Sequence, residues 1–246
     1  MDAENGPAAA LRGVESLPGE GELHVWRVSL SGEETRPSDF EAGLSDDERG
    51  RAGRFHFRSD AARFIAAHGA LRMILGAYAG MRPGELRFSR SAFGKPSLMH
   101  GEGARTRLRF NMADSGDVAL VAVSCGREVG VDIERMKDRP DLSGAAARCF
   151  CPAELEAYQA APAERREEIF YTFWSRKEAY IKARGEGMSL VLREIDVSVA
   201  PARIDRRWSL EDLPVDPGYR GAVVLDGNIN SVRYRTLRPR GAHEPA

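Results

Sequence analysis

Two acidic residues, Asp132 and Glu134, stand one residue apart within the apolar run EVGVDIE at 128–134. The run favours a β-strand, in which successive side chains point to opposite faces. Asp132 and Glu134 therefore share one face, while Val131 and Ile133 share the other. The Cα atoms of the two acids would lie roughly 7 Å apart, so their carboxylates repel each other unless a cation or a hydrogen-bond donor lies between them. We expect such a partner in the fold.

A third acid, Glu178, lies on a predicted long helix, where Trp174, Glu178 and Lys182 are spaced by four residues and form one ridge. Glu178 and Lys182 could be an ordinary exposed helical pair, stabilising the helix by roughly 0.2–0.5 kcal/mol. Asp132 and Glu134 could equally be the solvent-facing side of an edge strand. Taken together, however, two strand acids and one helix acid are the oxygen ligands that Mg²⁺ prefers, with positions left for water and substrate phosphates. The three acids together therefore suggest phosphate chemistry.

Lysine is rare in this chain, although basic residues are not. Of 36 basic residues only Lys95, Lys137, Lys177 and Lys182 are lysines. We interpret a lysine kept in an arginine-rich chain as a place that needs a compact ammonium rather than a planar guanidinium. Three of the four lie in the candidate motifs FGKPSL and WSRKEAYIK.

The composition excludes several classes of protein. A chain of 246 residues with 42% hydrophobic residues can build a substantial core. The net charge of -1 gives no sign of nucleic-acid or anionic-membrane binding. No secretory signal or membrane-spanning run is visible, so we expect a cytoplasmic protein, and a monomer. The three cysteines, Cys125, Cys149 and Cys151, are expected to be free thiols.

Hydrophobic periodicity and turn residues predict alternating helices and strands. In chain order we expect a strand at 24–30, a helix from Ser59-Asp60 to Gly80, strands at 86–90 and 107–112, an antiparallel hairpin of 118–124 with 128–134, helices within 142–160, a long helix over 167–184, and strands at 194–200, 219–225 and 230–237.

Several ordered motifs resemble those of one enzyme family. GVDIE at 130–134 and WSRKEAYIK at 174–182 resemble its two acidic motifs, and FGKPSL at 93–98 resembles its G-K-P segment. FNMADSGDVALVAV and RFHFRSDAARF resemble two further segments. The chain is thereby identified, over about residues 45–190, as similar to the 4′-phosphopantetheinyl transferases of the Sfp type.

This resemblance implies an α+β fold of two similar α/β subdomains related by a pseudo-twofold, each a small antiparallel sheet packed with a long helix. The corresponding boundaries are a loose tail at 1–20, subdomains at 21–126 and 127–238, and a frayed tail at 239–246. The implied reaction moves the 4′-phosphopantetheine arm of coenzyme A to a serine of an acyl or peptidyl carrier protein. It requires Mg²⁺ and releases 3′,5′-ADP.

The resemblance also assigns roles to individual residues. Asp132, Glu134 and Glu178 would coordinate Mg²⁺, and the catalytic set would be Glu178 as the base for the carrier serine, Lys182 beside the leaving phosphate, and Asp132. Contacts to coenzyme A would come from Arg51, Arg63, Gly94, Lys95, Pro96, Asn111, Asp114, Ser115, Lys177 and Lys182. A solvated surface arginine remains an alternative for Arg51 and Arg63.

One motif departs from the family pattern. Ala113-Asp114 stands where relatives usually have Ser-His, and an aspartate beside the 3′-phosphate would repel it by roughly 1 kcal/mol or more. We expect weaker binding of coenzyme A than in a relative with histidine. Two other functions remain open: a carrier-protein or nucleotide binding module that has lost activity, and an unrelated Mg²⁺-dependent phosphohydrolase.

Overall fold

The computed structural model describes residues 16–32, 35–99, 107–137, 141–186 and 192–237. Most of the expected tail at 1–20, and all of that at 239–246, lies outside the described residues. None of the described helices combines the length and the apolar character that crossing a bilayer requires.

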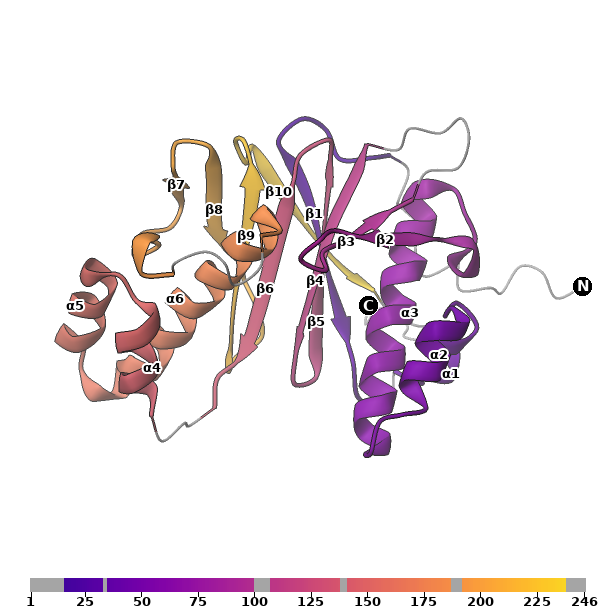
Figure 1. Cartoon of the computed structure of the whole chain (residues 1–246), viewed down its shortest axis with the longest axis horizontal. Coiled ribbons are helices and arrows are strands. Elements are labelled where there is room, and N and C mark those ends of the chain that lie inside the picture. Colours follow the sequence, from indigo (N-terminus) through magenta and orange to yellow (C-terminus); the bar gives the residue numbers. More distant parts are fainter. Residues whose placement is uncertain (1–15, 33–34, 100–106, 138–140, 187–191, 238–246) are drawn as a thin grey trace, which may run out of the picture.

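Two four-stranded sheets pack against each other, and a long helix covers the outer side of each (Figure 1). Helix α3 (Arg58–Ala79) covers the first sheet and helix α6 (Ala163–Arg184) covers the second. The expected α+β class, with two units that each pack a sheet against a long helix, is confirmed. Three cores follow from this layering: one under each helix and one between the sheets.

The first sheet alternates cleanly between its two faces. On β1, Leu23 and Val25 enter the core between the sheets, while Trp26 and Val28 pack under α3. The strand order is β10-β1-β5-β4, with β10 at Ser231–Leu237, β1 at Glu22–Ser29, β5 at Val118–Cys125 and β4 at Leu108–Ser115. Strand β10 pairs in parallel with β1, so the last strand of the described residues joins the first sheet. A small separate hairpin is made by β2 (Phe88–Arg90) and β3 (Pro96–Leu98).

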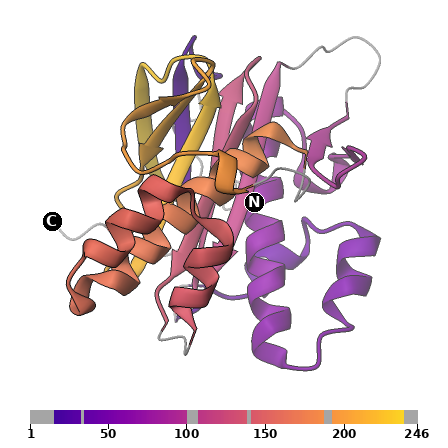
Figure 2. The ribbon, with the colours of Figure 1, turned by 60° about the vertical axis from the view of Figure 1, so that its left-hand side comes forward.

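The second sheet is antiparallel throughout and lies against α6. Its order is β6-β9-β8-β7, with β6 at Val129–Arg135, β9 at Tyr219–Asp226, β8 at Trp208–Asp212 and β7 at Ala202–Ile204. Figure 2 shows α4 (Leu142–Cys149) and α5 (Pro152–Ala160) packed beside α6. The remaining short helices are α1 (Ser38–Glu41), α2 (Asp46–Ala52), η2 (Pro83–Glu85) and η4 (Leu192–Glu194).

The predicted hairpin of 118–124 with 128–134 is wrong. Strand β5 pairs with β4 and β1, whereas β6 pairs with β9 in the other sheet. The tight turn at Gly126, with φ of 72°, carries the chain from one sheet to the next instead of folding it back. The prediction failed because both strands are apolar and buried on two sides, so a short turn alone cannot tell a hairpin from a crossing between sheets.

The predicted strand at 194–200 is also wrong. Residues 195–200 form no strand, because their carbonyls accept hydrogen bonds from cationic side chains of α6. Arg176 Nη1 donates to the carbonyls of Val197 (2.8 Å) and Ser198 (3.1 Å), and Lys177 Nζ donates to that of Ile195 (2.6 Å). A β-ladder would need these same acceptors.

Other predictions are confirmed. The strands expected at 24–30, 219–225 and 230–237 correspond to β1, β9 and β10. Helices α3 and α6 end where expected, at Gly80 and Gly185, which adopt left-handed φ of 65° and 67°. The three cysteines are free.

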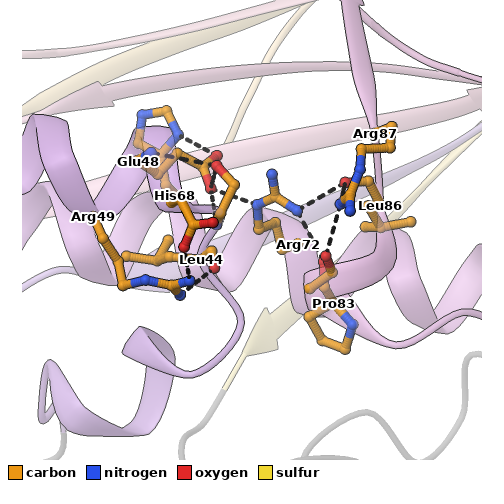
Figure 3. A network of polar contacts seen from close by, with 11 residues as sticks. Leu44, Glu48, Arg49, His68, Arg72, Pro83, Leu86 and Arg87 are labelled. Atoms are coloured by element: carbon orange, nitrogen blue, oxygen red, sulfur yellow. Dashed lines mark hydrogen bonds and ion pairs between the residues drawn. The ribbon is translucent and has the colours of Figure 1, made fainter.

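A half-buried carboxylate, Glu48, connects α2 to α3 (Figure 3). Its Oε2 accepts from the Arg72 Nε at 2.6 Å, and its Oε1 lies 3.6 Å from the His68 Nδ1. It also closes the capping box of α2 with Ser45. Burial alone would raise the pKa of the Glu48 carboxyl, but the bonds from His68, Ser45 and Arg72 outweigh it and lower that pKa to about 2. Arg72 is held in turn by the carbonyls of Pro83 and Leu86.

We therefore predict that Glu48→Gln destabilises the protein in a pH-dependent way. The depressed pKa means that the ionised carboxylate favours the folded state above about pH 4.5, by on the order of 3 kcal/mol. This contribution disappears as the pH falls through about 2. Urea unfolding of both proteins between pH 7 and pH 2 should show a stability difference that is full at neutrality and shrinks in acid. An equal difference at all pH values would contradict it. Asp46→Asn, at an exposed position of the same helix, is the control.

Candidate active site

Strand β6 presents its polar face to helix α6. Val129, Val131 and Ile133 belong to the core between the sheets, so Asp132 and Glu134 point the other way, as the alternation predicts. The strand and helix approach so closely that a Cβ at Gly130 would lie 2.0 Å from the Ala179 carbonyl oxygen. Because Gly130 has no side chain, β6 can pack close to the backbone of α6, which brings the acids of β6 near the side chains of that helix.

Asp132 has one oxygen bonded and one without a partner. Its Oδ1 accepts from the Lys182 Nζ at 2.5 Å, while its buried Oδ2 has no hydrogen-bond partner. Burial raises the pKa of the Asp132 carboxyl to about 7; Lys182 opposes this rise, and the charges of Glu134 and Glu178 add to it. Since buried polar atoms are nearly always paired, an unpaired carboxylate oxygen here indicates a ligand-binding position.

Glu134 is held in one orientation by two donors. The indole Nε1 of Trp174 donates to its Oε1 at 3.1 Å, and the Ser115 hydroxyl donates to its Oε2 at 3.1 Å. Trp174 is itself stacked on Phe170, with ring centroids 6.3 Å apart and planes 7° from parallel. Each Glu134 oxygen can still accept from, or coordinate, a further group. Such outer contacts are typical of carboxylates that bind metals.

Glu178 and Lys182 lie one turn apart on α6 and face β6. Lys182 reaches across to Asp132, so the ridge is not an ordinary exposed helical pair. Burial raises the pKa of the half-buried Glu178 carboxyl, Lys182 lowers it and the nearby Glu134 raises it. A carboxylate with a raised pKa is a better proton acceptor near neutral pH.

The acids of β6 and α6 have the donor chemistry for Mg²⁺. They offer carboxylate oxygens from a strand and a helix, and one of these oxygens is buried without a partner. The ligand oxygens of Asp132, Glu134 and Glu178 are not all within 4.8 Å of one another. Within the described part of the chain, the one set of three potential metal ligands that meets this distance is Cys151, Glu154 and Asp196.

The set of Cys151, Glu154 and Asp196 has a structural role. Glu154 Oε2 accepts from the Cys151 backbone N–H at 2.9 Å and forms an ion pair with the Lys177 Nζ at 2.8 Å, and its Oε1 accepts from the Val197 N–H at 2.8 Å. Its oxygens are therefore already engaged in the fold, which leaves the unpaired oxygen of Asp132 as the better candidate for a metal.

Lys177 does not reach the acidic site. It is fully buried, and its ammonium contacts Glu154 at 2.8 Å and the carbonyls of Leu192 at 2.8 Å and Ile195 at 2.6 Å. Two hydrogen bonds to carbonyls and one ion pair therefore engage this ammonium within the fold. The expected contact between Lys177 and coenzyme A has no support from this position.

Three other residues expected to contact coenzyme A bond to β6 or to Glu128 just before it: Asn111 and Ser115 from β4 of the first sheet, and Lys95 from the β2–β3 hairpin. Lys95 Nζ donates to Glu128 Oε2 at 2.7 Å, and burial lowers the pKa of this ammonium although Glu128 raises it. Asn111 Oδ1 accepts from the Val131 N–H at 2.9 Å. Ser115 accepts from the Arg135 N–H at 3.1 Å. All of these bonds end on β6 or on Glu128 just before it.

The remaining residues expected to contact coenzyme A lie on the β2–β3 hairpin, α2, α3 and β4. Gly94, with φ of 85°, and Pro96 belong to the β2–β3 hairpin, and Pro96 lines a cavity of about 240 Å³. Arg51 lies over the Phe64 ring, 5.0 Å from its centroid. Arg63 donates to Asp60 at 2.6 Å and lies 3.5 Å from Asp117 in the β4–β5 turn. Asp114 is exposed near the end of β4.

Two family models together match most of the described chain. Residues 36–126 match the model described as "4'-phosphopantetheinyl transferase, N-terminal". Residues 128–217 match the model described as "4'-phosphopantetheinyl transferase superfamily". The boundary between the two matches falls at the turn where the chain crosses from β5 to β6.

Individual proteins match over most of their length. The 4′-phosphopantetheinyl transferase HetI of Nostoc sp. is 38% identical over 211 residues, covering 84% of this chain and 88% of that protein. The 4′-phosphopantetheinyl transferase Sfp of Bacillus subtilis is 30% identical, covering 80% and 91%. Among solved structures, the holo-[acyl-carrier-protein] synthase of Thermotoga maritima matches with a TM-score of 0.34 and 18% identity, covering 41% of this chain and 63% of that one.

The buried pair of Lys177 and Glu154 yields a stability prediction. Lys177→Met should lower the free energy of unfolding by about 3–5 kcal/mol, because it leaves the Glu154 charge buried without its cation. Replacing both residues by methionine should cost less than the sum of the two single changes. Urea unfolding at pH 7 measures each value, and Lys137→Met, at an exposed lysine, should change it by less than about 0.5 kcal/mol. A Lys177→Met protein as stable as the wild type would refute the structural role.

Proposed function

Because the chain belongs to the 4′-phosphopantetheinyl transferase superfamily, as a two-part member of the Sfp type, we propose how this transferase works and on what it acts. It moves the phosphopantetheine arm of coenzyme A to a serine of an acyl or peptidyl carrier protein. The reaction depends on Mg²⁺ and releases 3′,5′-ADP. The observation that carries the proposal is the buried, unpaired Asp132 Oδ2 among Glu134, Glu178 and Lys182.

Asp132, Glu134 and Glu178 would hold the magnesium ion. When bound, the ion supplies positive charge to the pyrophosphate of coenzyme A and aligns the phosphorus that is attacked. Trp174 and Ser115 keep the Glu134 carboxylate fixed through their two hydrogen bonds, so less conformational entropy is lost when the site binds its ligands.

Glu178 is the proposed general base. It accepts the proton of the carrier serine hydroxyl as the serine oxygen forms a bond to the phosphorus that carries the pantetheine arm. The bond between that phosphorus and the bridging oxygen breaks, and the electron pair leaves with 3′,5′-ADP. Lys182, which is 30% exposed in its side chain, is the proposed cation that neutralises the charge developing on the leaving phosphate.

The nucleotide end of coenzyme A is assigned to residues on the first half of the chain. Arg51 and Arg63 are the proposed donors to its 3′-phosphate, because a guanidinium can bind phosphate through two parallel hydrogen bonds. Pro96 of the β2–β3 hairpin lines the cavity of about 240 Å³, and Gly94 stands two residues before it in the same hairpin. Gly94 has no side chain to prevent close approach of its backbone.

Intact-mass analysis of an apo carrier protein tests the reaction directly. Incubation with this enzyme, coenzyme A and Mg²⁺ should add one phosphopantetheine to the carrier, and chelation of the metal should prevent it. Glu178→Gln should slow the transfer by about 10²–10⁴-fold, the range for loss of a general base, and Asp132→Ala should abolish it. Glu156→Gln, an exposed acid on α5, is the control.

Other outcomes of this experiment separate the competing functions. Free phosphate without carrier modification would indicate a phosphohydrolase, and binding without any product would indicate an inactive module. Full activity in both Asp132→Ala and Glu178→Gln would overturn the proposed mechanism.

The unusual Asp114 gives a separate prediction about affinity. An ionised aspartate about 4 Å from a phosphate opposes binding by roughly 1 kcal/mol even in high dielectric. Asp114→His should therefore tighten binding of coenzyme A several-fold, and Asp114→Asn should give part of that gain. Neither should affect dephospho-coenzyme A, which lacks the 3′-phosphate. Isothermal titration calorimetry with both ligands measures this, and no gain for coenzyme A in Asp114→His would rule out repulsion at this position.

A further inference from the structure

Strands β4 and β6 are edge strands of different sheets that meet through side chains. We call their contact the seam. In the sheet orders β10-β1-β5-β4 and β6-β9-β8-β7, each has one neighbour in its own sheet. The outward N–H groups of Val131 and Arg135 on β6 donate to Asn111 Oδ1 and Ser115 Oγ of β4. The open edge of β6 is thus satisfied by side chains rather than by a β-ladder.

Lys95 completes this edge at the start of β6. Its Nζ donates to the Val129 carbonyl at 3.1 Å, to the Ala183 carbonyl at 2.9 Å and to Glu128 Oε2 at 2.7 Å. Its side chain is only 14% exposed. Since an ammonium has three N–H donors, these three acceptors use its full capacity and leave none for a phosphate.

The three acceptors come from elements that are distant in the sequence. Lys95 belongs to the β2–β3 hairpin, Val129 to β6 and Ala183 to the last turn of α6. A cation is favoured at a helix C-terminus, where free carbonyls concentrate negative charge. Glu128 also accepts from the Arg109 Nε of β4 at 3.1 Å. The hairpin, both seam strands and α6 are therefore tied together around one ammonium.

We propose that Lys95 is a positioning residue, which latches the β2–β3 hairpin to β6 and α6 and does not contact a phosphate of coenzyme A. Its effect on coenzyme A rests on the proposed function. The hairpin forms one wall of the cavity of about 240 Å³ through Pro96 and Lys95 itself, while Glu128, Arg109 and Gly185 line it from the other elements. Releasing the latch lets this wall move relative to the acids of β6, and so weakens binding of the whole nucleotide.

Kinetics with two substrates distinguish a latch from a phosphate ligand. Lys95→Met should raise the KM for coenzyme A and for dephospho-coenzyme A by the same factor, about tenfold, which corresponds to about 1.4 kcal/mol. The kcat should stay within about twofold, because the acids and Lys182 are untouched. Arg51→Gln, by contrast, should raise the KM for coenzyme A alone. Lys137→Met is the matched lysine control and should change neither value.

Glu128→Gln opens the same latch from the other side and guards against a folding defect in the lysine variant. It should raise both KM values as Lys95→Met does, and the double variant should be no worse than either single variant, because the two groups act as one unit. A KM raised for coenzyme A but not for dephospho-coenzyme A would identify Lys95 as a phosphate ligand and overturn the proposal. Unchanged KM values for both substrates would overturn it as well.

Hydrogen exchange tests the latch without any substrate. In Lys95→Met the amides of residues 88–99 should exchange faster than in the wild type, while those of β1 and β5, which belong to the first sheet, should not change. If the wild type modifies no carrier protein but this pattern is found, the proposed function fails and the latch stands. If transfer is normal and exchange of the hairpin is unchanged, the latch fails and the proposed function stands.

Discussion

The structure depends on the way in which two sheet edges meet at the seam. An open strand edge exposes backbone groups that must be hydrogen-bonded. On the edge of β6 that faces away from β9, the partners are the side chains of Lys95, Asn111 and Ser115 rather than another strand. This arrangement fixes β6 with its apolar face between the sheets and its acidic face toward α6. Without a firmly held β6, the carboxylates of Asp132 and Glu134 would have no defined position.

The close contact of β6 with α6 follows from the same constraint. Gly130 removes the side chain that would collide with the Ala179 carbonyl, so the helix comes near enough for Lys182 to bond Asp132. Several charges then share a partly buried space, where burial raises the pKa of Asp132 to about 7 and raises that of Glu178. Charges buried at such cost are typical of sites that bind or transform a ligand.

Two lysines five residues apart on α6 illustrate what separates a structural charge from a functional one. Lys177 is fully buried, donates to two carbonyls and forms an ion pair with Glu154. Lys182 is partly exposed and forms an ion pair with one oxygen of Asp132, whose other oxygen is unpaired. The first arrangement is closed and holds α6 to the segment before β7, while the second can exchange partners when a substrate binds.

The sequence by itself determined the local pattern and the family. Alternation within GVDIE placed the two acids on one face, spacing by four placed Glu178 and Lys182 on one ridge, and the terminal glycines ended both long helices. The rarity of lysine drew attention to Lys95, Lys177 and Lys182, which each lie against a carboxylate, but also to Lys137, which is exposed. These features depend on near neighbours in the chain, which a sequence displays directly.

Only the tertiary structure decided which strands pair and what each polar side chain contacts. The turn at Gly126 reads equally well as a hairpin or as a crossing between sheets, and the partner of β6 turned out to be β9, about ninety residues later. Nor did the sequence distinguish Glu128, in the same turn, from an ordinary surface acid, although it anchors Lys95 and Arg109. The physical reason is that pairing and hydrogen-bond satisfaction are settled by contacts between remote segments, where several local choices have similar free energies and the packing of the whole core selects one.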